Sequence, residues 1–252
     1  MSLKVGTAGW TISAKARQDF PDAGSSLERY SSVFPVVEIN SSFHRPHRIS
    51  TWERWRDSTP NDFRFSVKIP KEISHQRKLI SCEEPLAVFL EQVTRLGEKL
   101  AVLLIQLPPK LEFNADIVGS FLTSLLTKTG VRAVCEPRNE TWFTKEADIL
   151  LKDFMVARVA ADPAPSPGAA VPGGWLGMSY WRLHGSPHMY RSSYADRMEH
   201  YAKALIGSAA MSRDVWCIFD NTASSAAIDD ALLLRELVER GAESSAEAVR
   251  PR

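Results

Sequence analysis

Eight short apolar segments recur along the chain, and they constrain its fold more than any other feature of the sequence. Each segment is rich in β-branched residues and is followed by turn or polar residues, which is typical of buried strands. Stretches with helical spacing separate several of them, most clearly residues 85–99, 114–127, 194–209 and 223–239, and this alternation predicts parallel strands. The predicted strands are residues 3–8, 36–41, 63–69, 101–107, 131–136, 156–161, 179–184 and 215–220.

The number of alternations favours a closed barrel over an open sheet. Eight units within residues 1–240 predict one domain, a single (β/α)₈ TIM barrel with its site at the C-terminal ends of the strands. An open doubly wound sheet would carry fewer strands and a GxGxxG turn after the first strand, and this motif is missing. Residues 163–178 are rich in Pro and Gly and predict a long loop in place of a helix. Residues 241–252 hold few large apolar groups and predict a flexible C-terminal tail.

The charge balance and the cysteine content indicate which partners and which redox state to expect. The 31 Lys and Arg residues nearly balance the 30 Asp and Glu residues, which leaves a net charge of +1. So small a charge gives no general attraction to membranes or nucleic acid, and nucleic acid stays a disfavoured partner. The 3 cysteines are unevenly spaced without a CxxC motif, which predicts reduced thiols. No apolar run approaches roughly 18 residues and no leader precedes the first strand, so we expect a cytoplasmic protein of open oligomeric state.

Alternate side chains along a strand share a face, so the polar residues orient each strand. The outer face of a barrel packs against helices and must be apolar, which places faces such as Phe65, Val67 and Ile69 outside. The charged faces then point to the barrel axis, with the charges gathered at the C-terminal mouth, where solvent and ligands reach them. The predicted inward-facing residues are Val5, Thr7, Gly9, Val36, Glu38, Asn40, Arg64, Ser66, Lys68, Val102, Leu104, Gln106, Val134, Glu136, Arg138, Arg158, Ala160, Asp162, Tyr180, Arg182, His184, Trp216, Ile218 and Asp220.

Seven ordered segments resemble the YecE-like family, a group of TIM-barrel proteins that share a domain of unknown function. The likeness runs from about Val5 to about Leu234. The resemblance implies the same barrel and a pocket at the strand C-termini, and it implies no particular reaction. His44 follows Phe43 where the family usually has Tyr, and Asp220 stands where an Asn-Asn pair is common, which bears on the charge of the pocket. The matching segments are GTAGW at 6–10, VEINSSF at 37–43, FSVK at 65–68, QLPP at 106–109, EPR at 136–138, WRLHG at 181–185 and DNT at 220–222.

The charges of the inward faces suggest acid/base chemistry on an anionic substrate. Lys68, Arg138 and Arg182 supply cationic donors, so we expect a small anionic or phosphate-bearing ligand, such as a sugar derivative. The alternative interpretation is a structural network in which these charges pair with one another. Candidate general acids and bases are Glu136, which ranks first, Glu38, Asp162 and His184.

Further residues near the strand ends are candidates for ligand contact. His75, in the loop after the third strand, is a second histidine that can transfer protons near neutral pH. Trp10, Phe43 and Trp142 can form apolar walls for a sugar ring or a base, although packing of the loops explains them equally well. The polar residues Asn40, Gln106, Asp220 and Asn221 complete the candidate set.

Two other functions remain open at this point. The first is a metal-assisted phosphodiesterase acting on nucleic acid, because five strands carry residues of metal-ligand type. The sequence has no HxH or HExxH motif and the nearby cations oppose a divalent ion, so we expect no cofactor while a divalent metal stays possible. The second is a non-catalytic metabolite-binding protein. ATP and serine-hydrolase motifs are missing, and Cys135 and Cys217 fall on helix-facing sides. The candidate metal ligands are Glu38, Glu136, Asp162, His184 and Asp220.

Overall fold

The computed structural model describes residues 2–248, and all eight predicted strand segments form strands within it. The sixth segment is interrupted at Val159 and therefore counts as two strands, and the loop that follows it adds one more. The strands are β1 (Ser2–Ala8), β2 (Val36–Ile39), β3 (Arg64–Lys68), β4 (Leu100–Gln106), β5 (Arg132–Glu136), β6 (Ala157–Arg158), β7 (Ala160–Asp162), β8 (Gly173–Gly174), β9 (Met178–Leu183) and β10 (Asp214–Phe219).

The strands form one sheet that closes on itself. Its order is β7-β9-β10-β1-β2-β3-β4-β5-β6-β8, and every neighbouring pair is parallel except β6 with β8. Strands β6 and β7 lie near opposite ends of this order, yet only Val159 separates them in the chain. The interrupted sixth strand therefore joins the two ends of the sheet, and the predicted α/β barrel is confirmed.

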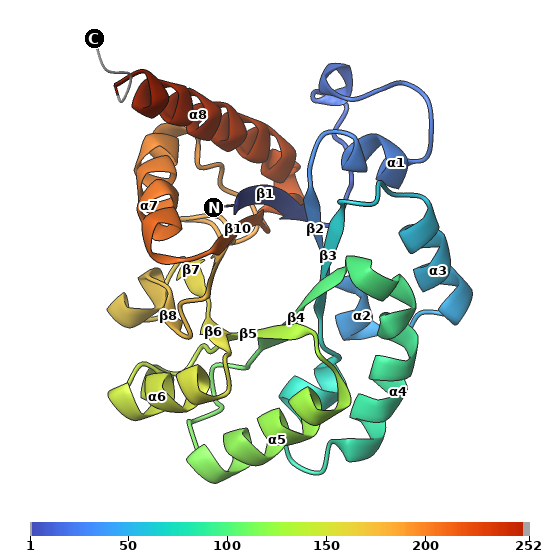
Figure 1. Cartoon of the computed structure of the whole chain (residues 1–252), viewed down its shortest axis with the longest axis vertical. Helices are drawn as coiled ribbons and strands as arrows, with labels where there is room; N and C mark the ends of the chain where they lie inside the picture. The colour runs from blue at the N-terminus through green and yellow to red at the C-terminus, as the bar shows by residue number, and fades with distance from the viewer. Residues whose placement is uncertain (1, 249–252) are drawn as a thin grey trace.

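The helices lie in a ring outside the strands (Figure 1). Several of them begin at side-chain caps that the sequence carries: Ser25 forms a capping box with Glu28, and Thr144 accepts a hydrogen bond from the backbone N–H of Ala147. The α-helices are α1 (Ser26–Ser31), α2 (Ser41–His44), α3 (Ile49–Asp57), α4 (Glu83–Val93), α5 (Ala115–Lys128), α6 (Lys145–Asp153), α7 (Met198–Met211) and α8 (Ala226–Ala248).

Short helical turns complete the connections between strands and helices. The predicted helix over residues 85–99 continues past α4 as a 3₁₀ segment, and the chain leaves helical geometry at Gly97, which has a φ of 59°. A residue with a side chain would be strained there, so glycine permits the turn into β4. The short helices are Arg17–Asp19, Glu72–Gln76, Thr94–Lys99, Glu140–Trp142, Pro167–Ala170, Ala195–Arg197 and Thr222–Ser224.

The Pro- and Gly-rich segment 163–178 follows its prediction, whereas part of the predicted C-terminal tail is helical. Residues 163–178 hold a 3₁₀ turn and the two-residue strand β8 and no α-helix, as their Pro and Gly content predicts. Helix α8 continues to Ala248, so residues 241–248 of the predicted tail are helical, and residues 249–252 lie outside the described residues. Ala-rich and Glu-rich sequence after Gly241 favours this extension.

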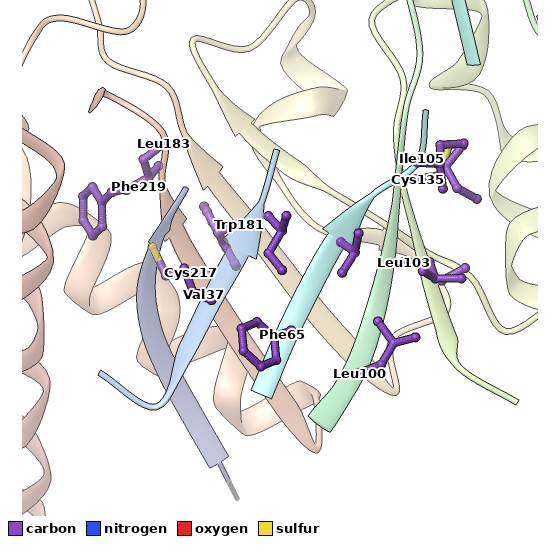
Figure 2. Close-up of a cluster of buried hydrophobic side chains, with 14 of the residues drawn as sticks. Val37, Phe65, Leu100, Leu103, Ile105, Cys135, Trp181, Leu183, Cys217 and Phe219 are labelled. Atoms are coloured by element: carbon purple, nitrogen blue, oxygen red, sulfur yellow. The ribbon is translucent and has the colours of Figure 1, made fainter. Parts of the chain in front are cut away.

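The outward strand faces form a continuous apolar layer beneath the helices. Figure 2 shows Val37, Phe65, Leu103 and Trp181 on this layer. The cysteines Cys135 and Cys217 also lie in it, buried and unpaired, as predicted. The barrel interior holds a second, smaller apolar cluster that includes Val36, Val102, Leu104, Val134, Tyr180, Trp216 and Ile218.

The predicted phase of the first strand is wrong. Val5 belongs to the outer apolar layer, and Thr7 donates its backbone N–H to the Tyr30 hydroxyl of α1, so both residues face outward. Gly6 and Ala8 face the interior, where Ala8 packs against the inner cluster. A buried threonine is tolerated outside because Tyr30 satisfies its polar atoms, which alternation alone could not foresee.

The predicted phase of the sixth strand is also wrong. Ala157 and Val159 face the interior, and Arg158 points outward, where its Nε donates to Asp148 of α6 at 2.8 Å. Ala160 packs in the outer layer. Asp162 also lies on the outer side and accepts a hydrogen bond from the Tyr194 hydroxyl at 2.7 Å. Small residues form the inner face of this strand, and the outer face carries charges that neighbouring helices and loops pair.

Candidate functional site

Arg182 lies at the centre of the barrel mouth and is fully buried. Its Nε and Nη2 donate to the two carboxylate oxygens of Glu38 at 3.0 and 2.6 Å, in a two-pronged contact. Nη1 donates to Glu136 at 2.5 Å and to the side-chain oxygen of Gln106 at 3.0 Å. Nη2 also donates to Asp220 at 2.9 Å. One guanidinium on β9 therefore joins side chains from β2, β4, β5 and the end of β10.

His184 and Arg138 extend this cluster. The His184 Nδ1 lies 2.9 Å from Asp220 Oδ2, and its Nε2 lies 2.9 Å from Glu136 Oε1. Arg138 forms an ion pair with Glu136, and its Nη2 lies 2.8 Å from His184 Nε2. We call the following set the Arg182 network: Glu38, Glu136, Arg138, Arg182, His184 and Asp220.

Burial and the neighbouring cations shift the pKa values of two carboxylates in the Arg182 network in opposite directions. Burial alone would raise the pKa of Glu136, but Arg182, Arg138 and His184 hold that pKa well below its ordinary 4.5. Asp220 behaves in the same way, because Arg182 and His184 outweigh its burial and lower its pKa. Both carboxylates are therefore ionised at neutral pH. This pairing was the alternative interpretation of the sequence, and the structure realises it for these residues.

Two residues that the sequence reasoning did not select support the network from below. The hydroxyl of Tyr180 donates to Glu38 at 2.8 Å and lies 2.9 Å from the Ser66 hydroxyl. Both residues lie on the inward faces, two positions before Arg182 and Lys68 respectively. Their position on the same inward face as Arg182 and Lys68 could have identified them, but a tyrosine or serine in a strand usually serves to pack the core.

Lys68 is the cation of the mouth that the network leaves unpaired. Among residues 3–241, whose side chains the structure describes, its Nζ has no hydrogen-bond acceptor or ion-pair partner, and it lies 4.0 Å from the centre of the Phe43 ring. Burial and then the charge of Arg182 lower the Lys68 pKa to about 8, although Glu38, Glu136 and Asp220 oppose that shift. His75 contacts the same Phe43 ring at 4.9 Å, and burial, Lys68 and Lys71 lower its pKa. Lys68, Phe43 and His75 therefore lie together at the mouth.

Two other polar atoms at the mouth lack partners. Arg138 Nε is buried without an acceptor, and Asn40 Oδ1 is buried without a donor within the described part of the chain. The Asn40 amide nitrogen lies 3.5 Å from Asp220, which ties Asn40 to the edge of the Arg182 network. Buried polar atoms of folded proteins are usually paired, so unpaired ones at the open end of a barrel suit a ligand.

Four predicted site residues do not join this cluster. Asp162 is bonded to Tyr194 on the outer side of the barrel. Trp142 is buried, donates its indole N–H to the Leu111 carbonyl and packs against Phe113, so it supports a loop. The remaining two are Trp10, which packs edge-on against Trp55 at 5.1 Å, and Asn221, which donates to Asp230 at 2.6 Å and to the Ser192 carbonyl.

The donor set does not fit a divalent metal. The carboxylates that a metal would need already hold the Arg182 guanidinium, and Asp162 points away from them. Among residues 2–248 no group of three or more His, Cys, Asp and Glu side chains is arranged to hold an ion. We therefore derive no metal step for this site.

A groove of about 490 Å³ lies beside the mouth, along α2, the helical turn Glu72–Gln76 and α4. Phe43 lines this groove and also contacts Lys68. The groove carries the cations Arg45 and Lys71 and the acidic Glu84, while its Arg77 is paired with Glu72 at 2.9 Å. Its volume lies in the range of small-molecule sites.

None of the helices in residues 2–248 has an apolar stretch long enough to cross a membrane.

Comparisons with known proteins place the chain in a family. A model of the DUF72 family, described as proteins of unknown function, matches residues 4–252. The UPF0759 protein YunF of Bacillus subtilis strain 168 is 26% identical over 271 residues, which cover 94% of this chain and 95% of YunF. The UPF0759 protein YecE of Escherichia coli K12 is 36% identical over 84 residues, which cover 33% of this chain and 31% of YecE.

Similarity of structure agrees with similarity of sequence. The solved structure of a DUF72 family protein from Enterococcus faecalis V583 superposes with a TM-score of 0.79 at 19% identity, over 94% of this chain and 95% of that chain. Identity at this level shows the fold alone. Together with the match of the family model over nearly the whole sequence, these findings show that the chain belongs to the DUF72 family.

Proposed function

We propose that the protein is an enzyme that binds a small polar substrate with an anionic group at the barrel mouth and acts on it by acid/base chemistry. The observation that carries this proposal is the unpaired Lys68 amine, which lies among buried charges that are otherwise paired. A buried cation without a partner costs stability, and such groups cluster at functional sites.

Donors for the anionic group are available without disturbing the Arg182 network. Arg138 Nε and Lys68 Nζ are free to donate, and Asn40 Oδ1 is free to accept from a substrate hydroxyl. Arg182 was an expected anion-binding residue, but its guanidinium is fully engaged by protein carboxylates. We assign Arg182 to positioning, and Arg138 with Lys68 to the substrate.

Proton transfer is assigned to Lys68, with His75 beside it. A pKa of about 8 lets Lys68 exchange its proton near neutral pH, which a general acid or base requires. Glu136 ranked first among the candidates, but its oxygens are held by Arg182, Arg138 and His184 and its pKa is far below neutrality. Glu136 and Glu38 are therefore better suited to orient Arg182 than to carry protons.

The proposal predicts that small anions stabilise the folded protein. Phosphate, sugar phosphates and short carboxylates are added in a thermal unfolding series, because a ligand that binds only the folded state raises the melting temperature. We expect a rise of a few degrees that is lost in Lys68→Met and Arg138→Met. The exposed Lys128 provides a matched control, and Lys128→Met should keep the rise. Identical responses of all three variants would contradict the assignment.

A measurement of hydrogen exchange on the bound ligand distinguishes catalysis from mere binding. Anions that stabilise the protein are incubated with it in deuterated water, and proton NMR follows the exchange of their C–H protons. An acid/base enzyme should exchange at least one such proton, and Lys68→Met should slow that exchange by about 100-fold or more. Binding without exchange for every stabilising ligand would leave a binding protein and refute the enzymatic part.

A further inference from the structure

The placement of Lys68 suits a role beyond proton transfer. It is the last residue of β3 and lies on the inner face, at the end of the barrel where βα-loops form active sites. Its side chain is 9% exposed, so the amine is largely shielded from water while remaining open to the mouth. No acceptor among the described side chains of residues 3–241 fixes Nζ, which leaves its lone pair free to react once the proton is removed.

The surroundings keep this amine reactive without neutralising it. Arg182 repels the protonated form, while the carboxylates that attract it are already bonded to Arg182. Desolvation and a neighbouring cation are the two environments that activate lysine as a nucleophile. The charged and titratable groups that act on Lys68 come from β2 (Glu38), β5 (Glu136), β9 (Arg182), the end of β10 (Asp220) and the turn after β3 (His75).

We propose that Lys68 Nζ forms a covalent imine with a substrate aldehyde or ketone that also carries an anionic group. This inference rests on the proposed function and specifies its substrate class. The neutral amine attacks the carbonyl carbon, a C–N bond forms, and one proton of the amine passes to the carbonyl oxygen. A second proton, taken from solvent, reaches that oxygen, the C–O bond breaks, water leaves, and a protonated imine remains. No oxidant or reductant is required.

Nearby groups suit the other demands of this step. Arg138 Nε can hold the anionic group while Lys68 attacks, which divides the two tasks between two cations. His75 lies against the same Phe43 ring as Lys68, and its lowered pKa keeps the imidazole neutral near pH 7, so it can accept the proton that the amine loses and pass it to the oxygen. The groove lined by Phe43, Arg45 and Lys71 adjoins this point and can accept the remainder of a larger substrate.

Reductive trapping tests the inference. The full chain is incubated near pH 7 with pyruvate or with glyceraldehyde 3-phosphate and sodium cyanoborohydride, which reduces an imine to a stable amine. Peptide mass spectrometry then locates the adduct. We expect Lys68 to be labelled at least about 10-fold faster than the exposed Lys128, because a lowered pKa leaves more free amine.

Variants separate the inference from the function on which it rests. Lys68→Arg retains the cation but cannot form the adduct, and Arg138→Met should slow labelling of Lys68 by both probes. If Lys68 is labelled no faster than Lys128, the imine is refuted. In that case, stabilisation by anions that still depends on Arg138 and Lys68 would leave the proposed function standing. Loss of that stabilisation as well would refute both.

Discussion

At the scale of single residues, the barrel mouth contains a side chain that weakens the fold. Lys68 has a pKa of about 8 in the folded protein, compared with its ordinary 10.5. This difference corresponds to a cost of about 3 kcal/mol when the amine is protonated in both states. The cost is fully present below about pH 8 and disappears as pH rises towards 10.5, because only the unfolded chain then holds the proton. A residue retained for packing would not carry such a cost.

Lys68→Met should therefore stabilise the protein at neutral pH. We expect the free energy of unfolding at pH 7 to rise by roughly 1–3 kcal/mol, since the substitution removes a poorly solvated charge and keeps an apolar stem against Phe43. Urea unfolding at pH 7 and pH 10 measures the effect, and the gain should shrink at the higher pH. A destabilised variant at pH 7 would show that Nζ has a stabilising partner in solution.

At the scale of elements, the spacing of β1 and β2 depends on one glycine. A Cβ added to Gly6 would lie 2.2 Å from the carbonyl oxygen of Val36, its partner in the parallel pair. That oxygen also accepts the hydrogen bond of the Tyr30 hydroxyl at 2.9 Å, so it cannot move without loss. Beyond Lys4, which lies over the Trp216 ring, the inner face of this strand therefore carries only the small residues Gly6 and Ala8.

Gly6→Ala should destabilise the barrel by about 3 kcal/mol or more, because the strands must separate to accept the methyl group. Gly207, exposed on α7 with no atom within 4 Å of an added Cβ, provides the matched control. Gly207→Ala should raise stability by about 0.5–1 kcal/mol through helix propensity. Denaturant midpoints compare the two variants, and equal midpoints would contradict the close approach of β1 and β2.

At the scale of the whole molecule, the Arg182 network fastens the barrel mouth. Residues far apart in sequence meet there, for example Glu38 and Arg182, which are separated by 144 positions and joined at 2.6 Å. The lowered pKa values of Glu136 and Asp220 contribute stability that is present at neutral pH. This contribution is lost as pH falls below the ordinary values of these carboxylates and through their lowered values in the folded protein.

Arg182→Met should reverse this pH dependence. The carboxylates of Glu38, Glu136 and Asp220 would lose their shared guanidinium, and we expect a loss of about 3–5 kcal/mol at pH 7. Burial, no longer opposed by Arg182, then raises the pKa values of Glu136 and Asp220, so the variant should gain stability as pH falls from 7 to 5. Arg132→Met, which breaks an exposed ion pair with Asp214, should cost at most about 1 kcal/mol and show no such gain. A parallel pH profile for the two variants would contradict the role of Arg182.

Much of the site could be predicted, because the alternation of residues along a strand shows which side chains face the barrel interior. The charged faces of β2, β3, β5, β9 and the end of β10 brought together Glu38, Lys68, Glu136, Arg182 and Asp220. Phase failed on β1 and on the sixth strand, where polar residues on the outer face are paired by groups outside the strand: Tyr30 for Thr7 and Asp148 for Arg158. These partners lie outside the strand, 23 and 10 positions away, so the alternation of residues within the strand cannot reveal them.

The sequence by itself determined the architecture: eight apolar segments alternate with helices, which is more strands than an open doubly wound sheet usually carries, and a closed barrel covered by helices buries such a parallel sheet. It also determined that charges gather at one end. Only the tertiary structure decided which charges neutralise one another and which stay available. Pairing depends on distances of a few ångströms between side chains from different strands. The strand pattern shows to which face a side chain points, but it does not show which other side chains lie close enough to pair with it. For that reason the tertiary structure alone shows that carboxylates occupy the Arg182 guanidinium, whereas the Lys68 amine faces the mouth unpaired.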